Sequence, residues 1–161
     1  MTELERIIFL GKYGTSREPM AMGILRDFHL KKPVEIMARG LVVQFPEPIN
    51  QKAEAVLIGN GINLSDYVAE PIMLSEITEK TLVLCMEEKN RAMLVEAFPE
   101  ITAEHVQVLS SYVGEELEIL DPYGGSVQTY GLCYETLKRT IKKLVELLND
   151  DETLWRQKVE G

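Results

Sequence analysis

Residues 11–17 have the sequence Gly-Lys-Tyr-Gly-Thr-Ser-Arg, which contains two aliphatic hydroxyls, one phenol and two cations but no thiol. The segment lies between an apolar run and a helical pattern, so it predicts a loop that connects a strand to the N-terminus of a helix. Unpaired backbone N–H groups and the helix dipole make such a loop a natural anion site. Arg17 could hold two oxygens of a phosphate. Considered alone, however, Arg17 can equally be interpreted as a surface arginine at the start of a helix, with no ligand to bind.

The surrounding pattern predicts the elements that position this loop. Apolar runs indicate strands over residues 5–10, 34–38, 81–86 and 105–109. Helical spacing indicates a helix that opens near Pro19 and further helices over 51–58, 87–98 and about 129–148. Strands that alternate with helices predict a parallel sheet covered on both faces, with ligands at the carboxyl ends of the strands. We expect one domain over residues 1–161, with 150–161 forming a short C-terminal tail helix that Leu154 and Trp155 dock.

The composition narrows the function classes. The net charge of −9 argues against a nucleic-acid or membrane partner, because phosphate surfaces need a positive footprint. The N-terminus does not resemble a secretory signal, and no apolar run is long enough for a membrane span, so a cytoplasmic location is expected. Cys85 and Cys133 lie in apolar stretches typical of buried free thiols. His29 and His105 are scattered, which argues against zinc. We expect no metal and no cofactor, and the sequence carries no prediction of the oligomeric state.

Four segments, in the same order along the chain, resemble the low-molecular-weight protein tyrosine phosphatase family (phosphotyrosine protein phosphatase I). They are the Arg17-Glu18-Pro19-Met20-Ala21 run after the loop, Gly61-Ile62-Asn63-Leu64-Ser65, Leu82-Val83-Leu84-Cys85-Met86-Glu87 and Asp121-Pro122-Tyr123-Gly124-Gly125-Ser126. The resemblance covers nearly the whole chain. It implies a three-layer α/β/α fold with a four-stranded parallel sheet, and a protein tyrosine phosphatase as the ancestral activity.

The resemblance also implies roles for individual residues. Arg17 takes the position of the phosphate and transition-state clamp, and Asp121 that of the general acid, although an Asp-Pro turn explains Asp121 equally well. Aromatic side chains at Tyr13 and Tyr123 would flank the mouth of the pocket, or they are plain surface tyrosines. The candidate ligand-binding residues are Lys12, Tyr13, Gly14, Thr15, Ser16, Arg17, Glu18 and Tyr123.

The chain departs from the family pattern at the residues that carry the chemistry. The family's nucleophilic cysteine corresponds to Gly11, so the nucleophile position is vacant. Ser16 stands where a second cysteine is often found, and Glu18 replaces the serine that follows the arginine. We expect Glu18 either to point away from the loop or to pair with Arg17 and partly plug the anion site.

Three functions follow as hypotheses. The first is a phosphatase-like protein without cysteine-dependent hydrolysis, which binds a small anion or a phosphate-bearing protein at the loop. The second is an active phosphomonoester hydrolase that uses another nucleophile; Thr15 and Ser16 have no histidine near them in sequence to activate them. The third is a scaffold with an empty pocket whose surface binds a protein partner.

Overall fold

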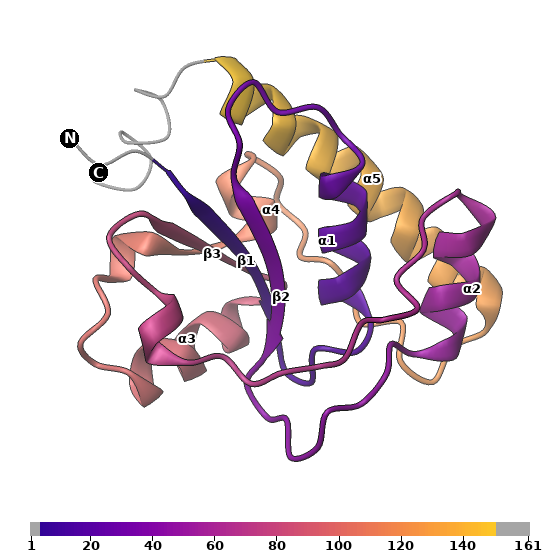
Figure 1. Ribbon diagram of the computed structural model, residues 1–161, viewed down its shortest axis with the longest axis horizontal. Coiled ribbons are helices and arrows are strands. Elements are labelled where there is room, and N and C mark those ends of the chain that lie inside the picture. Colours follow the sequence, from indigo (N-terminus) through magenta and orange to yellow (C-terminus); the bar gives the residue numbers. More distant parts are fainter. Residues whose placement is uncertain (1–3, 151–161) are drawn as a thin grey trace.

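A parallel four-stranded sheet forms the centre of the molecule in the computed structural model, which describes residues 4–150 (Figure 1). The strand order is β2-β1-β3-β4. The strands are β1 (Arg6–Gly11), β2 (Glu35–Gly40), β3 (Thr81–Cys85) and β4 (Val106–Val108). In the register, Phe9 of β1 lies opposite Ala38 of β2 and Leu84 of β3. The predicted four-stranded parallel α/β fold is confirmed.

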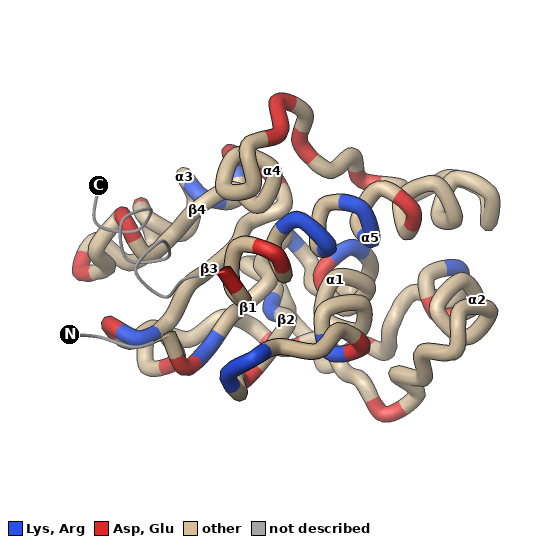
Figure 2. Tube along the Cα trace, turned by 90° about the horizontal axis from the view of Figure 1, so that it is seen from above, with Lys and Arg blue, Asp and Glu red and all other residues tan. Residues whose placement is uncertain are grey.

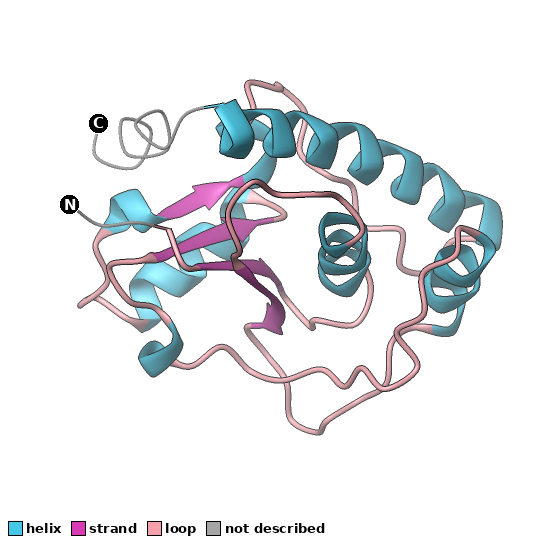
Figure 3. Cartoon of the chain, turned by 45° about the horizontal axis from the view of Figure 1, so that its top comes forward, coloured by secondary structure: helices cyan, strands magenta, loops and turns pink. Residues whose placement is uncertain are grey.

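Helices cover both faces of the sheet, as Figure 3 shows. The helices are α1 (Arg17–Arg26), α2 (Gln51–Gly59), α3 (Glu88–Ala97), α4 (Leu109–Tyr112) and α5 (Val127–Asp150). Short 3₁₀ turns lie at Leu74–Glu76 and Ala103–His105. Helix α4 was not predicted, because four residues are too few to display a helical period. The predicted tail helix and its docking residues Leu154 and Trp155 lie outside the described residues.

The strand β1 is buried on both faces because its side chains alternate between two hydrophobic layers. Ile7 and Phe9 pack in the larger layer with α1, α2, α4 and α5, whereas Ile8 and Leu10 pack in the smaller layer with Leu94 of α3. This two-sided burial explains the uninterrupted apolar run in the sequence. It also fixes where β1 ends, and therefore where the 11–17 loop begins.

Helix α1 lies between the sheet and α5, and every residue from Arg17 to Leu25 is buried. The helix therefore begins with two ionisable side chains, Arg17 and Glu18, that have little contact with water. It starts two residues before Pro19, which is compatible with proline because the first turn of a helix leaves its N–H groups free. Acidic residues gather instead in the segment between α4 and α5, which carries Glu115, Glu116 and Glu118 (Figure 2).

Candidate functional site

The 11–17 loop is held rigidly at the carboxyl end of β1. Backbone N–H groups of Leu41, Val42 and Asn50 donate to the carbonyl oxygens of the loop, at N···O distances of 2.7–2.9 Å. The Tyr67 hydroxyl donates to the Gly14 carbonyl. Gly14 has a φ of +73°, a conformation that favours glycine. The backbone of a strand-to-helix anion loop is thus present, as the sequence predicted.

Glu18 occupies the interior of this loop. Only 3% of the residue is exposed, and its Oε1 accepts a hydrogen bond from the Ser16 N–H at 3.4 Å. A Cβ atom built on Gly11 would overlap the Oε2 atom of Glu18. The residue at position 11 is therefore a glycine whose missing side chain leaves room for a carboxylate from the first turn of α1. The expectation that Glu18 plugs the loop agrees with this geometry.

Arg17 does not provide the partner that we expected for Glu18. The guanidinium donates from Nη1 to Oε1 of Glu87 at 2.9 Å and to the carbonyl of Ile119 at 2.6 Å. Its Nη2 lies 3.9 Å from Oδ2 of Asp121. Since only 4% of the Arg17 side chain is exposed, these buried contacts tie α1 to the residues that follow β3 and to the middle of the 113–126 segment. Glu18 was expected either to point away from the loop or to pair with Arg17, and the structure shows neither arrangement, because Glu18 lies inside the loop and Arg17 pairs with Glu87.

Glu87 is the site residue that the sequence analysis missed. Its position two residues after the end of β3 was the available signal. Strands β1 and β3 are neighbours, so the residues that follow them meet at one edge of the sheet. Partial burial acts to raise the pKa of the Glu87 carboxyl, but hydrogen bonds from Lys89 and Arg17 hold it below its usual value. Glu87 is therefore an ionised partner for Arg17.

The mouth of the loop is nearly filled. Lys12, Tyr13, Asp121 and Tyr123 surround a cavity of only about 20 Å³, which is room for about one water molecule. Both tyrosines are exposed, so the prediction that they flank the mouth agrees with their positions. Asp121 accepts a hydrogen bond from the Tyr123 N–H at 3.0 Å, which is the predicted Asp-Pro turn. Its Oδ2 also lies 3.9 Å from Nη2 of Arg17, so the Asp-Pro turn is compatible with the predicted role of Asp121 as general acid.

Burial without a paired cation raises the pKa of the Glu18 carboxyl. Loss of hydration is the main cause, and the negative charge of Asp121 adds to it, whereas Arg17 and the amides of Ser16 and Glu18 act in the opposite direction. The loop thus holds a carboxyl group that ionises less readily than a surface glutamate. Above its pKa the ionised carboxylate would repel a unit negative charge about 4 Å away by roughly 4 kcal/mol at an effective dielectric constant of 20.

This raised pKa predicts a pH-dependent effect of Glu18→Gln. A carboxyl whose pKa is higher in the folded than in the unfolded state stabilises the fold fully below the unfolded value of 4.5, and that contribution is lost as the pH rises through the folded value. Glutamine stays neutral at every pH. The variant should therefore melt at a higher temperature than the natural chain at pH 8, by an amount that shrinks towards zero near pH 4. Thermal melts over this range test it, and a natural chain that is the more stable at pH 8 would contradict it.

Neither cysteine supplies a nucleophile to the loop. Cys85 and Cys133 are free and buried, as the sequence predicted. Burial raises the pKa of the Cys133 thiol to about 11 and that of Cys85 further, so both remain protonated at neutral pH. Within residues 4–150, no group of three or more histidine, cysteine, aspartate or glutamate side chains is placed to hold a metal. Within the same residues, no helix has the length and apolar character that a membrane crossing requires.

Comparison with known proteins places this chain in a family. Residues 6–154 match the family described as low molecular weight phosphotyrosine protein phosphatase. The chain belongs to this family. A protein-arginine-phosphatase of Geobacillus stearothermophilus is 28% identical to it over 147 residues, which cover 91% of this chain and 98% of that protein.

Two solved structures show the same fold. A low molecular weight protein tyrosine phosphatase from T. tengcongensis is 30% identical, with a TM-score of 0.82 and coverage of 88% of this chain and 98% of that one. A YwlE arginine phosphatase, whose active-site cysteine is replaced by a phosphorylated serine, is 27% identical. It has a TM-score of 0.82 and coverage of 92% and 99%. The two relatives act on different phosphorylated residues, so membership of the phosphatase family does not by itself specify a substrate.

Proposed function

We propose that this chain is a phosphatase-family protein that has lost cysteine-dependent hydrolysis and serves as a binding module. The observation that carries the proposal is the Glu18 carboxyl, which lies in the 11–17 loop against the α-carbon of Gly11. In this proposal, Gly11 stands at the position of the catalytic cysteine. The phosphorylated active-site residue of the YwlE relative supports a nucleophile as a required part of the family's reaction.

Two losses act together at this position. Glycine has no side chain to attack phosphorus, and removal of the nucleophile of a serine protease costs about a millionfold in kcat. In addition, the Glu18 carboxyl accepts a loop N–H that would otherwise be available to a phosphate. Thr15 and Ser16 offer hydroxyls in the loop, but no histidine is among the residues that line the cavity there. A hydrolase that uses another nucleophile is therefore the less favoured alternative.

The proposed ligand is a small anion or a phosphate-bearing protein that displaces Glu18 from the loop. The backbone N–H groups of the loop remain in place for such a ligand, but the cavity of about 20 Å³ admits no phosphoryl group until the carboxyl leaves. Glu18 would therefore act as an internal competitor for the anion site. Without such displacement, the protein would bind partners through its outer surface, as in the scaffold hypothesis.

Hydrolysis is tested with para-nitrophenyl phosphate. We expect the natural chain to turn this substrate over at no more than about a millionth of the rate of an active family member assayed in parallel. The reason is the missing nucleophile at Gly11. Efficient turnover by the purified chain, accompanied by a covalent phospho-residue trapped elsewhere in the chain, would overturn the proposal.

Anion binding is tested by phosphate-dependent thermal stabilisation. We expect Glu18→Ser to gain a rise in melting temperature of about 5–10 °C at a phosphate concentration of about one hundred times Kd, while the natural chain gains almost none. The serine removes the carboxyl and leaves the loop N–H groups free. Glu116→Ser is the control. It removes an exposed carboxylate, changes the net charge by the same amount as Glu18→Ser, and should behave like the natural chain. Equal stabilisation of all three proteins would show that Glu18 does not compete with anions.

A further inference from the structure

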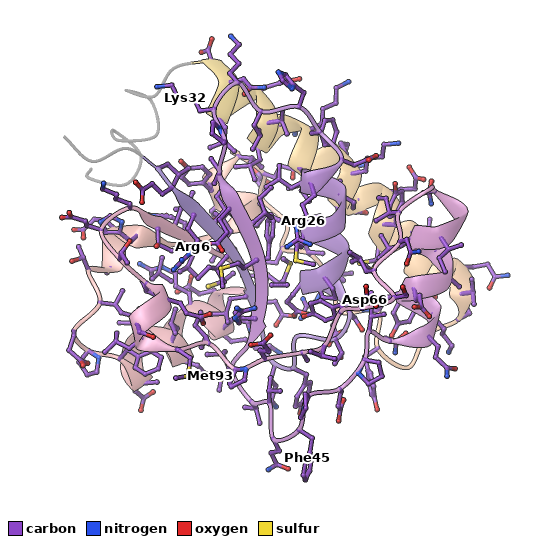
Figure 4. The ribbon with its side chains drawn as sticks, viewed as in Figure 1. Arg6, Arg26, Lys32, Phe45, Asp66 and Met93 are labelled. Atoms are coloured by element: carbon purple, nitrogen blue, oxygen red, sulfur yellow. The ribbon has the colours of Figure 1, made fainter. Side chains whose placement is uncertain are left out.

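A second concave site lies behind the 11–17 loop, between α1, β2 and the segment of residues 63–70. We call it the α1–β2 groove. Its cavity volume of about 570 Å³ falls within the range of small-molecule sites in proteins. In Figure 4, Arg26 lies between α1 and β2, and Asp66 lies on the 63–70 segment. The groove is far larger than the cavity at the mouth of the loop, and none of residues 11–17 lines it.

The lining of the groove combines an apolar part with charges of both signs. Met22 of α1, Met37 of β2 and Leu64 contribute apolar surface. Arg39 and Glu35 also line the groove, but their charges are already neutralised. Nη2 of Arg39 lies 2.8 Å from Oε2 of Glu76, and Oε1 of Glu35 lies 2.6 Å from Nε of Arg6.

Three charges of the groove remain without a counter-ion. Arg26, Asp66 and Glu70 form no ion pair with any residue in the part of the chain that the structure describes. Arg26 is also fixed in place, because its Nη2 donates to the Ile36 carbonyl at 2.7 Å and leaves the other N–H groups of the guanidinium available. The groove therefore offers one positioned cation, Arg26, and two carboxylates, Asp66 and Glu70, and neither carboxylate forms an ion pair with Arg26.

These charges identify the kind of ligand that fits. A phosphate or other simple anion would meet two carboxylates beside a single free guanidinium, and a simple cation would leave Arg26 unpaired. A molecule that carries a negative and a positive group can form ion pairs with Arg26 and with the two carboxylates at the same time. An α-carboxylate matches the planar guanidinium in a bidentate geometry, and an α-ammonium matches Asp66 and Glu70. We propose that the α1–β2 groove binds a free α-amino acid whose apolar side chain packs on Met22, Met37 and Leu64.

The groove is connected to the 11–17 loop through Tyr67. This side chain lines the groove, and its hydroxyl donates to the Gly14 carbonyl. Burial raises the pKa of the phenol, and the nearby charge of Glu18 raises it further, which keeps the hydroxyl a donor. A bound amino acid would contact the side chain that holds the loop backbone. The site is nevertheless independent of the anion chemistry of the loop, so it stands or falls separately from the function proposed above.

The test is calorimetric titration of the full chain with L-leucine, N-acetyl-L-leucine and L-leucine amide. We expect saturable binding of L-leucine and at least a tenfold weaker affinity for each of the two derivatives, because each lacks one of the two charges. Comparable binding of either derivative would overturn the zwitterion assignment. A lack of saturable L-leucine binding at millimolar concentrations would overturn the site itself.

Variants locate the binding. We expect Arg26→Gln, and separately the double change Asp66→Asn with Glu70→Gln, to weaken L-leucine binding at least tenfold. Lys142→Gln on the exposed face of α5 alters the net charge as Arg26→Gln does and should leave binding unchanged. Unfolding curves of each variant separate a loss of binding from a loss of folding. L-leucine binding that survives in the folded Arg26→Gln variant would contradict the proposal.

Discussion

A thiol introduced at position 11 is expected to restore phosphatase activity only when Glu18 is shortened in the same chain. In Gly11→Cys alone, the new Cβ would collide with the Glu18 carboxyl, which must move within a site that has almost no free volume. A carboxylate that stays about 4 Å from the sulfur would cost the thiolate roughly 4 kcal/mol at an effective dielectric constant of 20, which corresponds to about three pKa units. The single variant should therefore hold a protonated, unreactive thiol.

The double variant Gly11→Cys with Glu18→Ser removes that repulsion. The thiolate would then face the loop N–H groups, the N-terminus of α1 and Arg17, which are the groups that lower a cysteine pKa. We expect turnover of para-nitrophenyl phosphate to rise by about a thousandfold or more over Gly11→Cys alone, within the millionfold that a nucleophile can contribute. The reaction is followed by the release of nitrophenolate.

A matched control separates position from chemistry. Ser16→Cys with Glu18→Ser carries the same thiol in the same loop, but not at the end of β1, and should stay inactive. Equal activity of Gly11→Cys with and without Glu18 would show that the carboxyl does not block the site. An inactive double variant that still binds phosphate would show that another part of the family's machinery has been lost.

Arg17→Ala is expected to destabilise the fold by about 3 kcal/mol, because it breaks a buried ion pair and leaves charged and polar partners behind. The Arg17 and Glu87 side chains are 4% and 14% exposed, so water cannot replace the lost contact readily. The Ile119 carbonyl loses its donor as well. For a chain of this size, the loss corresponds to a melting temperature lower by about 6–12 °C.

Denaturant unfolding and thermal melts measure this effect. Lys142→Ala, a change of a cation on an exposed helical face, should remain within about 0.5 kcal/mol of the natural chain. The second change Glu87→Gln in the Arg17→Ala background should recover part of the loss, because it removes the unpaired carboxylate. A melting temperature of Arg17→Ala that matches the control would mean that the guanidinium is free for a ligand rather than needed by the fold.

Much of the fold was predictable from the chain, because its long elements have strong periodic patterns. The run of four apolar residues in β1 indicated a strand buried on both faces. The helical spacing predicted most of α5, whose residues Leu137, Ile141, Leu144 and Val145 are all buried. The prediction failed where the element was short, as in α4. Boundaries moved by one or two residues at most of the elements, where local pattern and tertiary contacts compete.

At the candidate site, the sequence by itself determined which groups are present. It placed a glycine rather than a thiol at position 11, a carboxyl at position 18 and an arginine at position 17. Chemical identity belongs to single residues and needs no tertiary information. The conclusion that no thiol of the 11–17 loop can attack phosphorus therefore needed only the chain.

Only the tertiary structure decided how these groups pair. The side chain of Glu18 could have turned outwards or towards Arg17, and the packing of α1 against the sheet and α5 directs it back into the loop instead. Arg17 found its partners 70 and 102 residues away, at Glu87 and Ile119. A buried charge must find its counter-charge among whatever the fold brings within reach, and that neighbourhood is a property of the strand order rather than of the local sequence.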